Sequence, residues 1–133
     1  MARPVVTIVV LDRRFQGLKK TVQAAAQKII SLTKSRGGCV EIYLVSNRFM
    51  NKNVLAFPAP KNFPRPDIRA RFLGEIYLNP DYIKKEKLGI ASQKLVYMLI
   101  HGFLHLLGYD HKKKTDRIKM EREEAKLLKI TNS

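Results

Sequence analysis

Histidine occurs in only one short stretch of this chain. All three histidines, His101, His105 and His111, fall within the segment His-Gly-Phe-Leu-His-Leu-Leu-Gly-Tyr-Asp-His. Residues four apart lie on the same face of an α-helix, so His101 and His105 can present two imidazoles to one ion. Gly108 can adopt the left-handed conformation that ends a helix, which lets His111 reach the same ion from outside it. The spacing therefore predicts a metal site with three histidine ligands.

Three neutral imidazoles leave one coordination position open, as in catalytic zinc sites, whereas structural zinc sites normally fill all four positions and rely on cysteine. One Zn²⁺ held this way can lower the pKa of a bound water to about 7 and polarise a phosphoryl oxygen. We therefore count His101 as a catalytic residue as well as a ligand. Asp110 is either a carboxylate that orients a ligand histidine or an ordinary turn residue. The alternative that all three histidines are core or turn residues is weak at this spacing.

The spacing HxxxHxxGxxH is also that of the metzincin proteases, but the general base of those enzymes is missing. They carry glutamate directly after the first histidine, and this chain has Gly102 there. No acidic residue occurs between Gly89 and Gly108. A metzincin-like peptidase is therefore kept only as an alternative function.

The charge of the chain points to a polyanionic partner. Lys and Arg outnumber Asp and Glu by 26 to 11, which gives a formal net charge of +15. A net charge with a magnitude of only about 2 to 8 is sufficient for the solubility of a small domain. Nucleic acid is the commonest partner of such a surface, and a membrane surface is the less favoured alternative. The length of 133 residues predicts one domain, residues 1–133, with one active site.

The chain carries no pattern that directs export. Cys39 is the only cysteine, so an intramolecular disulfide is impossible, and we expect it to be a small buried residue. The apolar run from Val5 to Leu11 is too short to span a membrane and is followed by Asp12-Arg13-Arg14 without a cleavage site. We expect a reducing, cytoplasmic location.

The hydrophobic pattern predicts an α+β fold. The run 5–11 is typical of a strand buried on both faces, and 54–57 of a brief strand near a sheet edge. The segment 89–107 is apolar on more than one face, which predicts a buried central helix that holds the histidines rigidly. A proline-rich basic loop from Pro58 to Arg71 is either a phosphate contact or a solvated connection. The expected strands are 5–11, 40–45, 54–57 and 74–79, and the expected helices are 18–32, ended by Gly37-Gly38, 80–85, 89–107 and 115–129.

Three segments together resemble a known family. The eleven residues from His101 to His111 resemble the signature of the YbeY-type endoribonucleases, which are metal-dependent proteins of ribosomal RNA maturation. Asn53-Val-Leu-Ala-Phe-Pro58 resembles the segment of that family that ends in Leu-Ser-Phe-Pro, and Gly74-Glu-Ile-Tyr-Leu78 resembles its Gly-Asp-Ile/Leu strand. Ala56 replaces the usual serine and Glu75 the usual aspartate. The resemblance covers about residues 40–130.

The resemblance implies a mixed four-stranded sheet with surrounding helices and a zinc site facing a positive groove. It implies cleavage of single-stranded RNA in ribosomal RNA maturation, such as at the 3′ end of the small-subunit RNA, and a part in ribosome quality control. The partners would be ribosomal RNA and the small ribosomal subunit, with no membrane and no DNA. Arg48 is the candidate for the functional arginine of the family. The attacking oxygen could belong to water or to a 2′-hydroxyl, and a silent ribosome-binding module with structural zinc is a further alternative.

Overall fold

The computed structural model describes residues 5–33, 38–59, 71–85, 91–109 and 112–131. Its strands are β1 (Val5–Val10), β2 (Gly38–Leu44), β3 (Val54–Pro58) and β4 (Arg71–Leu78). Its helices are α1 (Lys19–Leu32), which follows the 3-10 turn η1 (Arg13–Leu18), α2 (Pro80–Lys85), α3 (Ala91–Leu106) and α4 (Lys114–Thr131).

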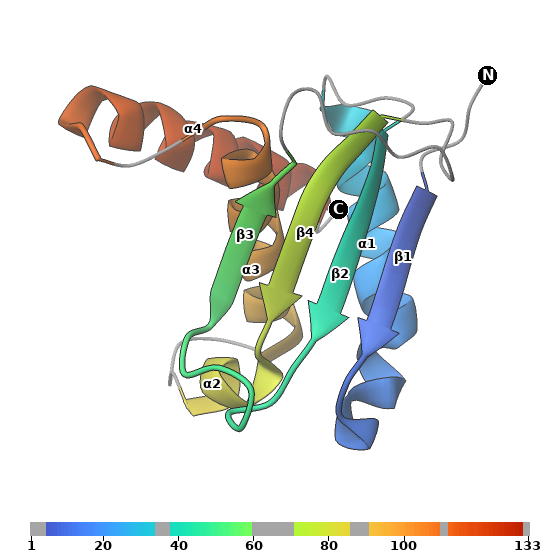
Figure 1. Cartoon of the computed structure of the whole chain (residues 1–133). Coiled ribbons are helices and arrows are strands. Elements are labelled where there is room, and N and C mark those ends of the chain that lie inside the picture. Colours follow the sequence, from blue (N-terminus) through green and yellow to red (C-terminus); the bar gives the residue numbers. More distant parts are fainter. Residues whose placement is uncertain (1–4, 34–37, 60–70, 86–90, 110–111, 132–133) are drawn as a thin grey trace.

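The four strands form one mixed sheet in the order β1-β2-β4-β3 (Figure 1). β1 pairs with β2 and β2 with β4 in parallel, whereas β3 runs antiparallel to β4 and forms an edge. The predicted α+β class with a mixed four-stranded sheet is therefore confirmed, as is the placement of the short strand at an edge. The parallel pairing of β1 with β2 is possible because α1 provides the long connection between these two strands.

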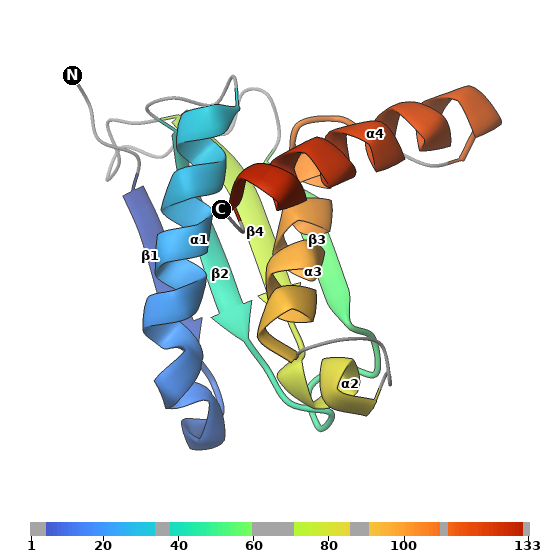
Figure 2. The ribbon, with the colours of Figure 1, turned by 180° about the vertical axis from the view of Figure 1, so that it is seen from behind.

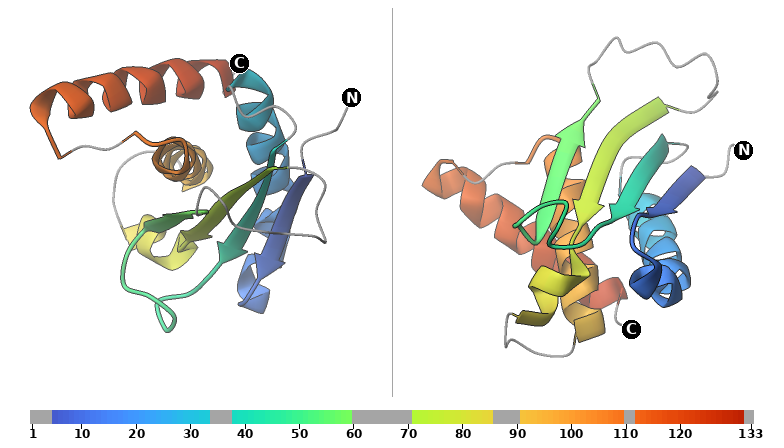
Figure 3. Two further views of the ribbon diagram at one scale, coloured as in Figure 1. Left: turned by 45° about the horizontal axis from the view of Figure 1, so that its top comes forward. Right: turned by 60° about the horizontal axis from the view of Figure 1, so that its bottom comes forward.

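In the described part of the chain, the helices that pack on the sheet lie on one face of it (Figures 2 and 3). Residues that face these helices, such as Ile42, Leu44 and Ile76, are fully buried. The prediction that the first strand is buried on both faces was wrong, because Val6 and Ile8 are buried while Thr7 between them is exposed. A continuous apolar run does not by itself say how many faces of a strand are covered.

Helix α3 packs against β3 and β4, and it also contacts α1, α2 and α4. Its apolar residues fill the space between the sheet and α4, which is why more than one face of the helix is apolar. The buried residues of α3 include Leu95, Leu99, Ile100, Phe103, Leu104 and Leu106. The backbone that carries His101 and His105 is therefore held between two layers.

Several boundaries differ from the sequence predictions. Helix α1 ends at Leu32, as predicted, and the Thr33 backbone N–H donates to the Ile29 carbonyl. Gly38 does not end this helix, because it already lies in β2. Strand β4 begins at Arg71, three residues earlier than expected. The middle of the basic loop, residues 60–70, lies outside the described residues.

Cys39 is buried, as predicted. None of the described helices has the length and apolar character that a membrane span requires.

Gly74 is required by the close approach of β3 to β4 and α3. Its backbone has φ +139°, a conformation that residues with a side chain rarely adopt. A Cβ at this position would overlap the carbonyl oxygen of Phe57 and would lie 2.8 Å from a methyl carbon of Leu106. The glycine of the Gly-Glu segment is thus explained by packing next to the histidine helix.

We predict that Gly74→Ala lowers the free energy of unfolding by about 2 kcal/mol or more, through backbone strain and overpacking. Urea unfolding followed by circular dichroism measures this change. Gly17→Ala is the matched control, because a Cβ at Gly17 meets no atom within 4 Å. Equal stability losses in the two variants would contradict the packing explanation.

Candidate metal centre

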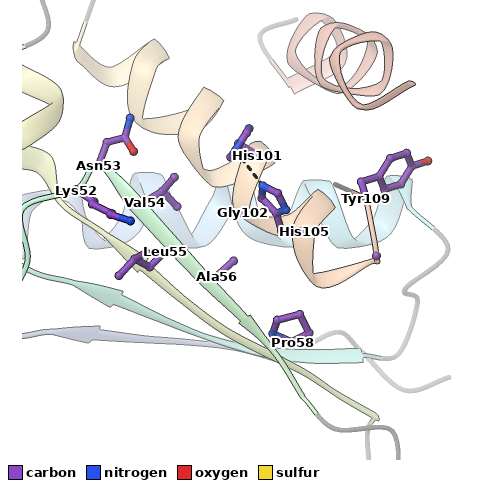
Figure 4. Close-up of a pocket in the computed structure, with 11 residues that line it drawn as sticks. Lys52, Asn53, Val54, Leu55, Ala56, Pro58, His101, Gly102, His105 and Tyr109 are labelled. Atoms are coloured by element: carbon purple, nitrogen blue, oxygen red, sulfur yellow. Dashed lines mark hydrogen bonds between the residues drawn. The ribbon is translucent and has the colours of Figure 1, made fainter. Parts of the chain in front are cut away.

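The side chains of His101 and His105 converge on one point beside α3. Their Nε2 atoms are 3.1 Å apart, and the rings meet edge to face with centroids 4.7 Å apart (Figure 4). The spacing of four residues places both rings on the same side of the helix, as predicted. Two nitrogens bound to one tetrahedral zinc at 2.0–2.1 Å would lie about 3.3 Å apart. The separation in the structure fits a shared ion.

Glu124 of α4 fixes the orientation of His101. Its carboxylate oxygen lies 2.8 Å from His101 Nδ1, and the Glu124 side chain is only 4% exposed. A buried carboxylate must be paired, and the imidazole provides the partner. Tyr97 lies one turn before His101 on α3. Its burial and, to a smaller extent, the charge of Glu124 raise the pKa of Tyr97.

This contact determines which nitrogen of His101 faces the shared point. An ionised carboxylate only accepts hydrogen bonds, so His101 Nδ1 carries the proton that it donates to Glu124. In the neutral ring, Nε2 then keeps its lone pair and accepts the hydrogen bond from His105 Nε2, 3.1 Å away. A carboxylate behind a ligand histidine is the usual means of orienting such a ligand. Sequence reasoning proposed Asp110 for this role and missed Glu124.

A signal for Glu124 does exist in the sequence. It lies four residues after Met120 and three before Leu127, and all three side chains are buried on the inner face of α4. A carboxylate at a core position of an amphipathic helix indicates a partner. The sequence alone predicts that the apolar residues of this helix face inward, namely Ile118, Met120, Ala125, Leu127 and Leu128. This prediction was wrong at Ile118 and Ala125, which are exposed.

The C-terminus of α3 has the form that the sequence predicted. Gly108 has φ +99°, its amide donates to the His105 carbonyl, and the Tyr109 amide donates to the Leu104 carbonyl. This is the hydrogen-bond pattern of a helix ended by a left-handed glycine. Asp110 and His111 lie outside the described residues, so the role of His111 as third ligand stays a prediction. Among the described residues, no group of three metal-binding side chains is found.

A cleft of about 480 Å³ lies between α3 and the edge strand β3 and contains both histidines (Figure 4). Its other walls come from β3, from the loop before it and from the end of α3. Lys52 and Asn53 of that loop line the cleft, and sequence reasoning did not single out Lys52 as a site residue. Ala56, which replaces the serine usual at this position of the motif, also lines it. The lining from β3 and from the end of α3 includes Val54, Ala56, Pro58, Gly108 and Tyr109.

Gly102, at the position of the protease glutamate, is buried against the sheet. A Cβ there would lie 3.0 Å from a methyl carbon of Ile76 and 3.4 Å from one of Val54. A larger side chain here would have to displace these methyl groups or turn into the histidine cleft, which Gly102 also lines. The peptidase alternative is disfavoured because the glutamate that would act as its general base is absent at this position.

Arg48 does not line the histidine cleft. It lines a separate pocket with Asp12, Arg14 and Asp81, below the C-terminal ends of the parallel strands. Arg14 binds both carboxylates, with Nη2 2.9 Å from Asp12 Oδ2 and 2.7 Å from Asp81 Oδ2. These contacts lower the pKa of both carboxyl groups, chiefly through hydrogen bonding. The exposed Arg48 has no ion-pair partner within the described ranges, and its catalytic role stays a prediction.

The loop between β2 and β3 joins the two pockets, and Asn79 fixes its course. The fully buried Asn79 side chain donates to Asn47 Oδ1 at 3.0 Å and to the Met50 carbonyl at 2.9 Å. The backbone N–H of Asn79 donates to the backbone carbonyl of Asn53. Arg48 and Lys52 are therefore carried by one anchored loop, Arg48 beside one pocket and Lys52 in the histidine cleft.

The chain is similar in sequence to known proteins. The family model described as Endoribonuclease YbeY matches residues 12–132. The Endoribonuclease YbeY of Pelagibacter ubique is 39% identical over 111 residues, which cover 77% of this chain and 71% of that protein. That of Nitrobacter hamburgensis is 34% identical over 119 residues, 84% of this chain and 62% of that protein. That of Persephonella marina is 41% identical over 64 residues, 46% of this chain and 40% of that protein.

The fold and the site define an α+β protein with a pair of imidazoles at a cleft beside an edge strand. The chain belongs to the YbeY endoribonuclease family, as its sequence motifs indicated. It spans less than two thirds of the length of several of the relatives that it matches.

We predict that Glu124→Gln lowers the affinity for Zn²⁺ about 10- to 100-fold, because the charge that orients His101 is lost. Competition with a chromophoric chelator measures the affinity. Glu121→Gln on the exposed face of α4 removes the same charge and serves as control. An unchanged affinity in Glu124→Gln would show that His101 needs no orienting carboxylate.

Proposed function

We propose that this chain is a metal-dependent endoribonuclease that cleaves single-stranded RNA. The observation that carries the proposal is the convergence of His101 Nε2 and His105 Nε2 in a cleft, with His101 held from behind by Glu124. Membership of the YbeY endoribonuclease family and the net charge of +15 support RNA as the substrate. The metzincin-like peptidase alternative has neither of these supports.

His101, His105 and His111 would hold one divalent ion, with zinc the best match to a set of imidazole ligands. The ion would supply Lewis-acid chemistry, acidifying a water molecule and polarising a phosphoryl oxygen. Glu124 holds the proton of His101 on Nδ1, which leaves Nε2 as a donor of electrons. Lys52 on the cleft wall would place a positive charge near the phosphate of the bound strand.

We further propose that the physiological substrate is ribosomal RNA and that the chain acts in its maturation, for example at the 3′ end of the small-subunit RNA, and in ribosome quality control. The small ribosomal subunit would be its partner, in the cytoplasm. These assignments rest on the family resemblance. A strongly basic surface agrees with them, because ribosomal RNA is a dense polyanion.

We expect His101→Ala, His105→Ala and His111→Ala each to reduce cleavage of single-stranded RNA to background and to lower the bound metal. Elemental analysis of the purified variants and a gel assay on a labelled oligonucleotide measure the two quantities. Chelation of the wild-type protein should abolish cleavage, and added Zn²⁺ should restore it. Circular dichroism checks that each variant is folded.

The outcomes separate the alternatives. Wild-type turnover in a histidine variant would contradict the proposed site. RNA binding without any cleavage by metal-loaded wild-type protein, unaffected by His111→Ala, would instead identify a ribosome-binding module with structural zinc. Cleavage of peptides but not of RNA would favour the peptidase alternative.

We predict that Arg48→Ala lowers cleavage by about tenfold or more without changing the metal content, because an exposed guanidinium can stabilise charge on a phosphate. Single-turnover kinetics measure the rate. Arg13→Ala removes an exposed arginine from η1 and is the matched control. Equal rates in the two variants would remove Arg48 from the catalytic machinery.

A further inference from the structure

The sheet face opposite the helices carries a cluster of aromatic side chains. Ile42, Leu44, Ile76 and Leu78 face the helices and are fully buried, so the residues between them point to the other face. No described helix packs on this face (Figures 1 and 3). The aromatic cluster consists of Tyr43, Phe49, Phe57 and Tyr77.

Tyr77 is the shared member of this aromatic cluster. It is paired in register with Tyr43 of the neighbouring strand, and their rings stack with centroids 4.7 Å apart. Phe49 stacks on Tyr77 at 5.8 Å, and Phe57 meets it edge to face at 5.7 Å. Phe49 is 59% exposed and Phe57 52% exposed. Two aromatic rings are thus held against a stacked pair while much of their surface faces solvent.

Hydrogen bonds fix the orientation of the tyrosine rings. The Tyr77 hydroxyl donates to Glu75 at 2.9 Å, and the Tyr43 hydroxyl donates to Glu41 at 3.3 Å. Partial burial and the hydrogen bond with Glu75 raise the pKa of Tyr77 to about 12. The aromatic cluster is therefore a pre-oriented surface, which reduces the entropy cost of stacking a ligand on it.

The aromatic cluster and the histidine cleft share the strand β3 and the loop before it. Ala56 and Pro58 line the cleft, and Phe57 between them contacts Tyr77 on the other face. Phe49 and Lys52 belong to the same anchored loop, and Lys52 lines the cleft. Because β3 is an edge strand, a chain leaving the cleft passes around a single strand to reach the open face.

We propose that Phe49 and Phe57, backed by Tyr77, stack unpaired bases of the RNA strand whose phosphodiester enters the histidine cleft. This inference rests on the proposed function, since it names a base-binding surface for the same substrate. Aromatic rings bind single-stranded nucleic acid in this way with little dependence on sequence. The proposed surface would thus extend the RNA contact beyond the cleaved bond.

The charges around the aromatic cluster determine which part of the RNA it contacts. Glu41 and Glu75 disfavour phosphate here, so the backbone would run along Arg48 and Lys52 while the bases cover the rings. An arginine-rich peptide could also pair with these carboxylates. The net charge of +15 and the exposed Arg48 beside Phe49 repel such a peptide and attract RNA.

The test measures binding separately from cleavage. Each cluster variant is made in a His105→Ala background, and its affinity for a fluorescent single-stranded RNA is compared with that of the background protein. We expect Phe49→Leu, which keeps apolar bulk but loses the ring, to weaken binding at least about fivefold, and Phe49→Trp to retain it. Leu32→Ala, an exposed apolar residue on the helical side, should change nothing. The salt dependence of binding should be the same in Phe49→Leu and its parent, because no phosphate contact is lost.

The chain has no tryptophan, so Phe49→Trp introduces a single indole whose fluorescence reports directly on stacking. RNA should quench this fluorescence, and an arginine-rich peptide should not. Equal RNA affinity of Phe49→Leu and its parent would overturn the inference, as would quenching by the peptide alone, which would assign the surface to a basic protein. Absence of cleavage by wild-type protein, with these binding effects intact, would instead overturn only the proposed function.

Discussion

The contact between the Glu124 carboxylate and His101 Nδ1 is the interaction on which the site depends. Through this contact a charged residue of α4 pairs with a histidine of α3. Glu124 lies on the buried face of α4, where its neighbours Met120 and Leu127 are apolar. A buried carboxylate is costly unless it is paired, so the same contact both satisfies Glu124 and fixes the tautomer of His101. The direction of His101 Nε2, and hence its meeting with His105, follows from the way two helices pack.

The edge strand β3 makes the second contribution. Because side chains alternate along a strand, one short segment lines the histidine cleft on one face and contributes to the aromatic cluster on the other. Gly74 lets β3 approach β4 and α3 closely, and Asn79 anchors the loop that leads into β3. The histidine cleft and the exposed aromatic cluster therefore share β3 and its anchored loop as their support.

Local patterns predicted most elements of the fold because their causes are local. The periodicity of apolar residues, the termination of α3 by Gly108 and the short strand that ends at Pro58 each depend on interactions within a few residues. The predictions failed where contacts between distant segments determine which residues are buried. Whether both faces of β1 are covered depends on where the helices pack, and the exposure of Ile118 and Ala125 depends on how α4 lies against α3.

The sequence by itself determined that His101 and His105 share a helix face and that Gly108 terminates the helix, because the period of an α-helix and the conformational freedom of glycine are properties of the chain. It also determined the family, through the motifs around these residues. Only the tertiary structure brought Glu124 behind His101, Lys52 to the cleft and Arg48 to a separate pocket. These placements depend on the packing of helices and the course of an anchored loop, which join residues far apart in the sequence.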